Sequence, residues 1–238
     1  MTATPLTAAG ADALDNPAWS ALTGAHAQFA VGSGDALRYR PEVSPIIALR
    51  DQHDPRSWAD LAALVGAGVQ VTLAGVSAEP PAGWERVGAF QGVQMVATDR
   101  LRSAPDADAL RLGADDALEM LALVRRTEPG PFEPETYRLG TYLGFRVAGE
   151  LVAMAGERLH ADGFTEISAV CTDSRFRGRG YASRLVKAVA HEIRERGDTP
   201  FLHASAANTG AIRLYEALGF EHRADRTFLV VRTPGPLA

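Results

Sequence analysis

Cysteine and long apolar runs are scarce in this sequence. Its 238 residues include one cysteine, Cys171, so no disulfide can form within the chain, which is typical of a reducing compartment. No stretch approaches the roughly 20 apolar residues of a membrane-spanning helix. The first residues have neither the basic start nor the apolar centre of a secretion signal. We therefore expect a soluble, cytoplasmic protein without a membrane partner.

Excess positive charge and metal-ligand patterns are also missing. The 24 lysines and arginines are outnumbered by 29 aspartates and glutamates, which gives a net charge of -5. Because nucleic-acid binding needs a basic surface, we expect no nucleic-acid partner. The acidic balance slightly favours a cationic small substrate. His160 and Asp162 lie near a hairpin with no ligand spacing around them, so we predict no metal site.

The chain is long enough for one large domain or two small ones. A short polar segment with a proline, residues 102–109, predicts a boundary. It separates an N-terminal lobe, residues 1–105, from a second domain, residues 106–238. The lobe has helix and strand patterns but no cluster of residues typical of catalysis. We predict an N-terminal α/β lobe whose role the sequence leaves open.

Strand and helix patterns alternate regularly in the second domain. A short strand and a helix precede a proline-rich loop, after which two strands meet at Ala148-Gly149, a tight hairpin signal. Residues 164–172 form a longer strand pattern, followed by a helix pattern at 181–196. A further strand, helix and strand complete the chain. This order predicts a mixed α/β domain with a largely antiparallel sheet flanked by helices.

The segment SRFRGRGYA, residues 174–182, joins the longer strand to the helix. The N-terminus of a helix presents unpaired N–H groups and positive charge, and glycine lets the backbone approach a ligand closely, so this loop predicts a phosphate site. A Walker loop would need Gly-Lys-Ser/Thr, which excludes it here. A dinucleotide fingerprint would need glycine or alanine where Ser183 stands, which disfavours it. The pattern R-x-x-G-x-A is met from Arg177 to Ala182.

RGRGYA after the strand ISAVCT resembles the pyrophosphate loop of the GNAT acyl-CoA N-acyltransferases. ANTGAIRLYEALGF, residues 207–220, resembles the second signature of that family. The resemblance covers about residues 109–232 and implies a GNAT-like sheet. It also implies an N-acetyltransferase that moves an acetyl group from acetyl-CoA to a primary amine by direct attack in a ternary complex. The alternatives are a non-catalytic acyl-CoA-binding or regulatory module, or an acyltransferase that uses a longer acyl-CoA. The N-terminal lobe could be a degenerate copy of the same fold.

The resemblance also implies which residues hold acetyl-CoA. The backbone from Val170 to Thr172 would pair with the pantetheine arm, and the N–H of Val170 would bond the thioester oxygen. Asn208 would cap its helix and touch the cofactor. With the pyrophosphate loop, the predicted set is Val170, Cys171, Thr172, Arg177, Gly178, Arg179, Gly180, Tyr181, Ala182, Ser183 and Asn208.

Two residues are candidates for proton transfer. An alkylamine has a pKa near ~10.4 and must lose a proton, and Glu166 is the candidate base, acting through water. It precedes Val170 by four residues, so the even spacing places both on one strand face. Tyr215 is the candidate acid for the leaving thiolate. The alternative for Glu166 is a polar strand residue without a catalytic role. The alternative for Tyr215 is an aromatic residue packed in the core. Cys171 has no evident histidine partner and is predicted to be a buried hydrophobe.

The acceptor amine, a small molecule or a peptide, is not identified by the sequence. The segment TEPGPFEPETY carries Glu128, Glu133 and Glu135 on a loop that three prolines stiffen. We expect these carboxylates to attract a protonated amine and Phe132 to cover an apolar stem. The alternative is a solvated acidic turn that does not touch the substrate.

Overall fold

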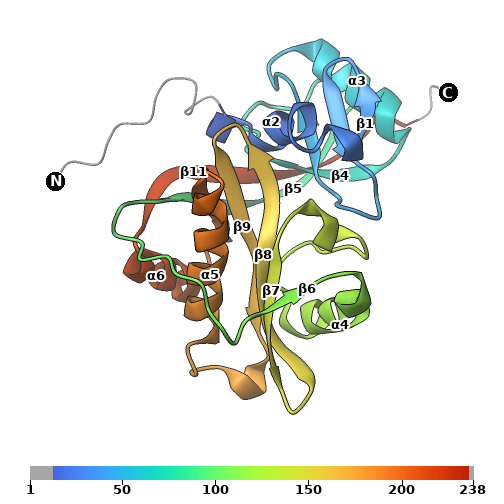
Figure 1. Ribbon diagram of the computed structural model, residues 1–238. Coiled ribbons are helices and arrows are strands. Elements are labelled where there is room, and N and C mark those ends of the chain that lie inside the picture. Colours follow the sequence, from blue (N-terminus) through green and yellow to red (C-terminus); the bar gives the residue numbers. More distant parts are fainter. Residues whose placement is uncertain (1–12, 236–238) are drawn as a thin grey trace.

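The computed structural model describes residues 13–235 (Figure 1). Their strands form one sheet of eleven, in the order β1-β2-β3-β4-β11-β5-β10-β9-β8-β7-β6. The neighbours are antiparallel except for the pairs β3–β4 and β9–β10. The fold is therefore mixed α/β and largely antiparallel, as predicted. The strands are β1 (Ala30–Ser33), β2 (Ala36–Tyr39), β3 (Ile47–Leu49), β4 (Gln70–Ala74), β5 (Glu85–Ala97), β6 (Leu110–Leu112), β7 (Tyr142–Val147), β8 (Glu150–Ala161), β9 (Phe164–Thr172), β10 (Thr199–Ser205) and β11 (Phe220–Arg232).

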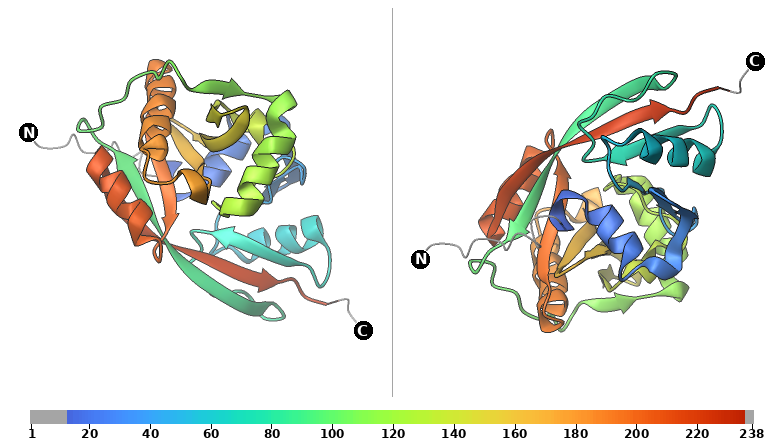
Figure 2. Two further views of the ribbon diagram at one scale, coloured as in Figure 1. Left: turned by 90° about the horizontal axis from the view of Figure 1, so that it is seen from below. Right: turned by 90° about the horizontal axis from the view of Figure 1, so that it is seen from above.

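Helices cover the sheet at several places. They are α2 (Pro17–Thr23), α3 (Pro55–Val65), α4 (Ala117–Thr127), α5 (Tyr181–Glu195) and α6 (Thr209–Leu218). Helix α5 packs on one face of β7, β8 and β9, and α4 packs on the opposite face of the same strands (Figure 2). Side chains at helix starts define the ends: Asp54 caps α3, and Asn208 caps α6 by accepting from the N–H of Ala211 at 3.1 Å.

The sheet continues across the predicted boundary between residues 105 and 106. Strand β5 precedes that boundary and pairs with β11 along its length and with β10 at one end. The first half therefore contributes a strand to the middle of the sheet, and the division into two domains stays a prediction. None of the residues 13–235 belongs to a helix long and apolar enough to cross a membrane.

Strands β9 and β10 separate after a short stretch of parallel pairing. The pairing runs from Phe164 opposite Thr199 to Ile167 opposite Leu202 and then ends. Beyond it, the edge of β9 that faces β10 has no paired strand. The two strands therefore open like a V in the middle of the sheet, and this opening positions the site.

A bulge interrupts β9 just beyond this point. Between the pairs Met154–Cys171 and Gly156–Ser168, β9 has one residue more than β8. Ala169 lies there with φ of 53°, in the left-handed region that side chains rarely adopt. The extra residue shifts the alternation of the strand.

Candidate active site

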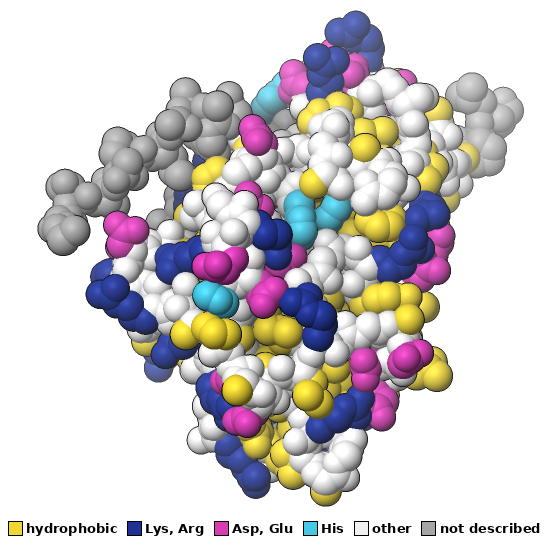
Figure 3. Space-filling view, in the orientation of Figure 1, with side chains coloured by type: hydrophobic (Ala, Val, Ile, Leu, Met, Phe, Trp, Pro, Cys, Tyr) yellow, Lys and Arg dark blue, Asp and Glu magenta, His cyan; other side chains and the backbone are white. Residues whose placement is uncertain are grey.

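A cleft of about 1270 Å³ opens where β9 and β10 diverge. Residues from both halves of the chain line it. The second half contributes the end of β9, the glycine loop and α6, and the first half contributes side chains that include Arg38 and Phe90. Basic and acidic side chains are interspersed on the face of the molecule in Figure 3.

The glycine loop adopts the conformation that the phosphate-site prediction needs. Gly178 and Gly180 have φ of 77° and 78°, in the left-handed region that glycine tolerates best. A Cβ atom at either position would meet no other atom within 4 Å. Steric crowding within the protein therefore does not explain these glycines, whereas an open cradle for a ligand does. Gly180 is also the N-cap of α5, whose first N–H groups have no partner inside the helix.

Two arginines of this loop have no acidic partner in the described part of the chain. Among the described residues, neither Arg177 nor Arg179 forms an ion pair, whereas Arg175 pairs with Asp173 and Arg184 with Asp106 and Asp108. The Arg179 guanidinium stacks on the ring of Phe176, 5.1 Å from its centroid. The loop therefore combines exposed N–H groups with two uncompensated charges, an arrangement suited to a pyrophosphate.

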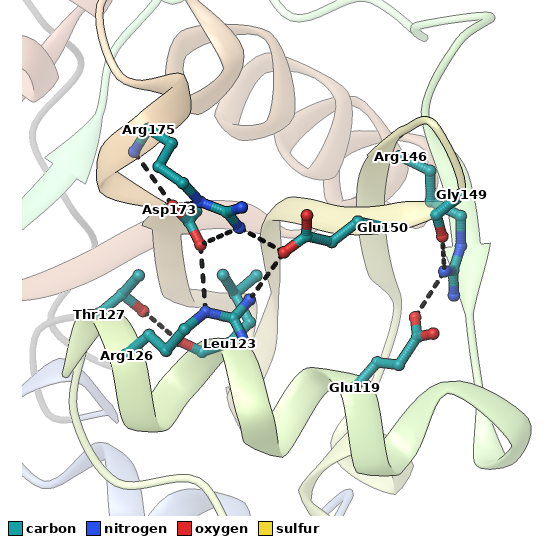
Figure 4. Close-up of polar contacts among 9 residues, drawn as sticks. All are labelled: Glu119, Leu123, Arg126, Thr127, Arg146, Gly149, Glu150, Asp173 and Arg175. Atoms are coloured by element: carbon teal, nitrogen blue, oxygen red, sulfur yellow. Dashed lines mark hydrogen bonds and ion pairs between the residues drawn. The ribbon is translucent and has the colours of Figure 1, made fainter.

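A polar cluster fixes the start of the loop (Figure 4). Asp173 follows β9 directly, and its carboxylate accepts from the N–H of Arg175 at 3.0 Å. It also accepts from Nε of Arg175 at 3.0 Å and from Nε of Arg126 on α4 at 3.1 Å. The hydrogen bonds from Arg175 hold the pKa of Asp173 well below its usual range, and Arg126 adds to the effect. The cluster, which Glu150 on β8 extends, thus joins α4, β8 and the loop.

The free edge of β9 lines the cleft beside the loop. Thr172 lies there, and its Oγ1 is buried without a hydrogen-bond partner among the described residues. Such an atom has an unused hydrogen bond that a ligand in the cleft would satisfy. Cys171 faces the other way into the core beside α4, and burial raises the pKa of its thiol to about 11. Its thiol is therefore a poor nucleophile at neutral pH.

Tyr215 projects from α6 toward the same cleft. Its side chain is mostly buried and packs edge-on against Phe220, with the ring centroids 6.0 Å apart. Burial raises the pKa of the phenol to about 12. The hydroxyl thus stays protonated at neutral pH. This is the protonation state that a proton donor requires.

The structure corrects the predicted position of Glu166. Ile167 and Val170 both pack on the α5 side, because the bulge at Ala169 shifts the alternation between them. Glu166, the neighbour of Ile167, faces the opposite side. Glu166 and Val170 therefore do not share a strand face, and the argument from even spacing was wrong.

Glu166 is fully buried, forms an ion pair with Arg158 and is hydrogen-bonded to His203. Arg158 donates from Nη2 to Oε1 at 2.6 Å and from Nε to Oε2 at 2.8 Å, and Nδ1 of His203 lies 2.7 Å from Oε1. Burial by itself raises the pKa of Glu166, but Arg158 and His203 outweigh it and lower the pKa to about 2. Glu166 is thus a weak base and has no exposed surface for water.

His203 and Arg158 are the residues of this network that sequence reasoning did not assign. Both line the cleft, with side chains 10% and 15% exposed. Nε2 of His203 lies 3.1 Å from Nε2 of Gln94, whose Oε1 accepts from Arg223 at 2.8 Å. The amide orientation of Gln94 therefore makes His203 Nε2 an acceptor and Nδ1 the donor to Glu166. No local sequence pattern indicates these contacts, because they join residues from five strands.

The loop after α4 reaches the cleft only in part. Glu128 and Glu133 line it, whereas Glu135 forms an ion pair with Arg138 outside it. Phe132 is buried in the core against Tyr142, with ring centroids 5.6 Å apart. The prediction that Phe132 covers the acceptor was therefore wrong, because the loop turns this ring inward.

The sequence of the chain is similar to those of known proteins. A family model described as "FR47-like protein" matches residues 142–229. Two curated proteins named mycothiol acetyltransferase are similar. The one from Thermobispora bispora is 38% identical over 105 residues, which cover 41% of this chain and 34% of that protein. The one from Thermomonospora curvata is 33% identical over 97 residues, 40% of this chain and 31% of that protein. The matched part spans about a third of the length of these relatives.

Two solved structures are similar over most of the chain. A GNAT-family protein from Novosphingobium aromaticivorans is 37% identical, with a TM-score of 0.83, over 94% of this chain and 99% of that chain. A GCN5-related N-acetyltransferase from Kribbella flavida is 21% identical, with a TM-score of 0.55, over 91% of this chain and 96% of that chain. The second comparison shows a shared fold.

Proposed function

Because the chain belongs to the GNAT family of acetyltransferases, we propose that it transfers an acetyl group from acetyl-CoA to a primary amine in a ternary complex. The observation that carries the proposal is one cleft that joins an uncrowded glycine loop, two arginines without an ion pair among the described residues, and the free edge of β9. The names of the shorter-matching relatives do not identify the acceptor, since the chain covers about a third of them.

The glycine loop and β9 would hold the two ends of the cofactor. N–H groups of Gly178, Gly180 and the first turn of α5 would bind the pyrophosphate, with Arg177 and Arg179 adding charge. The free edge from Val170 to Thr172 would pair with the pantetheine arm. Bound acetyl-CoA supplies the activated acetyl group. Asn208 caps α6 at the border of the cleft, where it would contact the cofactor.

Two groups of the chain would act on the reacting atoms. The N–H of Val170 would donate to the thioester oxygen as charge develops there. Tyr215 would donate its proton to the leaving thiolate, which its raised pKa permits because the phenol remains protonated. The Cys171 thiol would take no part in the transfer, since it faces the core beside α4.

Glu166 would act on the amine proton indirectly. Its carboxylate is shielded from the cleft, and His203 lies between this carboxylate and the cleft. We propose that the negative charge of Glu166 stabilises a proton on His203. For His203 to accept that proton at Nε2, the Gln94 amide, which now donates to this nitrogen, has to turn away. Glu166 is then a positioning residue and His203 the group that the amine reaches.

Glu166→Gln should lower kcat/KM for the amine by about tenfold, since a charge effect of one pKa unit corresponds to that factor. Glu157→Gln is the matched control. Glu157 is equally buried and pairs with Arg196 at 2.8 Å, but neither Arg196 nor its other partner His160 lines the cleft, whereas His203 beside Glu166 does. Both changes should reduce the free energy of unfolding by about 3 kcal/mol. Only the first should reduce turnover, and equal turnover in the two variants would leave Glu166 with a structural role alone.

The stability difference at Glu166 should also depend on pH. The folded-state pKa lies below the ordinary value of 4.5, so the stabilisation is present above 4.5 and is lost as the pH falls toward 2. The difference in unfolding free energy between the wild type and Glu166→Gln should therefore shrink on acidification. Chemical denaturation at a series of pH values measures it, and a constant difference would contradict the assigned ionisation.

The loop after α4 would attract the protonated amine. Glu128→Gln with Glu133→Gln should raise KM for the amine about threefold at low ionic strength and leave KM for acetyl-CoA unchanged, because exposed charges act weakly and are screened by salt. Glu135→Gln is the control, since Glu135 lies outside the cleft. If the double variant and the control behave alike, the loop is scaffold only.

Residues 1–105 would form a lobe that shapes the acceptor half of the cleft, on a domain of residues 106–238. Arg38 and Phe90 support this, because both line the cleft from the first half. Whether the lobe derives from a second copy of the fold stays a prediction.

Thiol release from acetyl-CoA with a panel of primary amines tests the proposed activity. Release that depends on the amine supports transfer. Tight CoA binding without amine-dependent release would instead indicate a binding module. Faster release from a longer acyl-CoA would indicate that the longer acyl-CoA, and not acetyl-CoA, is the donor.

A further inference from the structure

Two stacked phenylalanines form part of the cleft wall. In the strand pairing, Phe228 on β11 lies directly opposite Phe90 on β5 and Ala74 on β4, and all three residues line the cleft. The ring centroids of Phe90 and Phe228 are 4.8 Å apart, and the ring planes differ by 2°. The pair therefore presents a flat aromatic surface, the aromatic wall of the cleft.

The outer ring of the aromatic wall is open to the cleft. Phe90 is 50% exposed and is the only aromatic residue among the exposed large hydrophobic residues of the described chain. An exposed phenyl ring lacks the free energy of burial, which it gains when an apolar ligand group covers it. Because the two rings are already parallel, an offset third ring can continue the stack. The aromatic wall therefore matches an aromatic group better than a polar one.

The aromatic wall adjoins the residue proposed to accept the amine proton. His203 on β10 is paired with Gln94 on β5, and Gly92, two residues along β5, lies on the same face of the sheet. A Cβ at Gly92 would lie 2.6 Å from the Phe228 ring, so glycine lets this ring lie over residue 92, toward His203. The rings of Phe228 and His203 meet edge to face, with centroids 6.2 Å apart. A short linker therefore suffices to join a ring on the wall to an amine at His203.

The charges near the aromatic wall disfavour a second cationic group on the acceptor. Among the described residues that line the cleft, the acidic ones are Asp15, Glu128 and Glu133. Asp15 forms an ion pair with Arg226 at 3.1 Å, and the two glutamates lie on the loop after α4. Arg226 precedes Phe228 by two residues on β11 and also lines the cleft, so it repels a cation there. The group that covers the wall is therefore expected to be uncharged.

We propose that the acceptor is an arylalkylamine, a primary amine that carries an uncharged aromatic ring on a short linker. Its ring would stack on Phe90 and Phe228, and its nitrogen would reach His203. The inference rests on the proposed acetyl transfer, for which it gives the class of acceptor. The new N–C bond forms as the C–S bond of the thioester breaks. The amine proton passes to His203 and the leaving thiolate takes a proton from Tyr215, which yields an N-acetylated arylalkylamine and CoA.

Three acceptors test the aromatic wall: 2-phenylethylamine, 2-cyclohexylethylamine, which has a saturated ring of similar size, and ethylamine, which has no ring. Rates are compared per concentration of unprotonated amine, because the three amines differ in pKa. We expect kcat/KM for 2-phenylethylamine to exceed that for 2-cyclohexylethylamine by about fivefold, since ring stacking adds such a factor beyond area burial. Both ring amines should exceed ethylamine by at least about tenfold, since each buries its ring.

Two variants of Phe90 and a matched control test whether the preference comes from the aromatic wall. Phe90→Leu keeps an apolar side chain but removes the flat face, so it should reduce the phenyl-to-cyclohexyl ratio toward one. Phe90→Ser should also reduce the preference for both ring amines over ethylamine. Val87→Ser is the control, because Val87 is 41% exposed on the same strand but does not line the cleft. This control should leave both ratios unchanged.

The outcomes separate this inference from the activity on which it rests. Calorimetry with CoA first shows whether each variant is folded and binds the cofactor. Equal kcat/KM for the three amines, or unchanged ratios in both Phe90 variants, overturns the inference and leaves the transferase activity in place. A loss of CoA affinity in the Phe90 variants also overturns it, because the wall would then belong to the cofactor site. Absence of turnover with every amine, despite CoA binding, overturns the proposed function and this inference with it.

Discussion

Gly178→Asp and Gly180→Asp should each lose measurable CoA binding while the protein stays folded. Each change adds a side chain and a negative charge where N–H groups would face the pyrophosphate. The side chain has space in the protein, since no atom lies within 4 Å of either Cβ position. Isothermal calorimetry with CoA measures the loss, and a thermal unfolding curve monitors the fold.

Gly163→Asp is the matched control for these two variants. Gly163 has φ of 71°, close to the values at 178 and 180, and a Cβ there would also meet nothing within 4 Å. It lies in the turn between β8 and β9 and does not line the cleft. The backbone strain and the added charge are therefore comparable, but CoA affinity should be retained. Undiminished affinity in both loop variants would falsify the assignment of the cradle.

Tyr215→Phe should lower kcat by ~10²-fold or more, with little change in KM for acetyl-CoA. The ring and its contact with Phe220 remain, and only the proposed proton donor is removed. Tyr142→Phe is the control, because the Tyr142 hydroxyl is buried without a hydrogen-bond partner among residues 13–235 and lies outside the cleft. Steady-state kinetics should be measured where chemistry limits the rate. A kcat within about twofold of the wild type would make Tyr215 a packing residue.

The elements of the second half were largely predictable because local signals define their ends. Residues 164–172 form a strand with the predicted bounds, and the helix after the glycine loop begins at Tyr181 as expected. Asn208 caps its helix through a short-range contact that sequence shows directly. These features depend on neighbouring residues, so one sequence suffices to find them.

The strands of the first half, and the last strand of the chain, were less predictable. Strands β1, β2 and β3 are three or four residues long, too short for an alternation pattern to stand out. Strand β11 extends from Phe220 to Arg232, whereas only its apolar end was expected, because its first part consists of polar residues paired with β5. These residues form strands because they pair with neighbouring strands across the sheet, and a local sequence pattern does not encode that pairing.

The candidate site was harder to predict from the sequence than the strands were. The bulge at Ala169 reverses the alternation of β9, and nothing in the residue types of this strand announces it. The face of Glu166 was therefore mispredicted. Its partner Arg158 comes from the adjacent strand and His203 from the far side of the opening, so the ion pair that lowers its pKa exists only in the folded sheet.

Mass analysis after incubation with isotope-labelled acetyl-CoA tests the central claim most directly. Protein alone and protein with a primary amine are compared, and both the intact protein and the small molecules are weighed. Direct transfer predicts the labelled acetyl group on the amine nitrogen and none on the protein, since the only thiol, Cys171, faces the core. Labelled protein that passes its acetyl group to the amine, or an amine that never carries the label, would contradict the account.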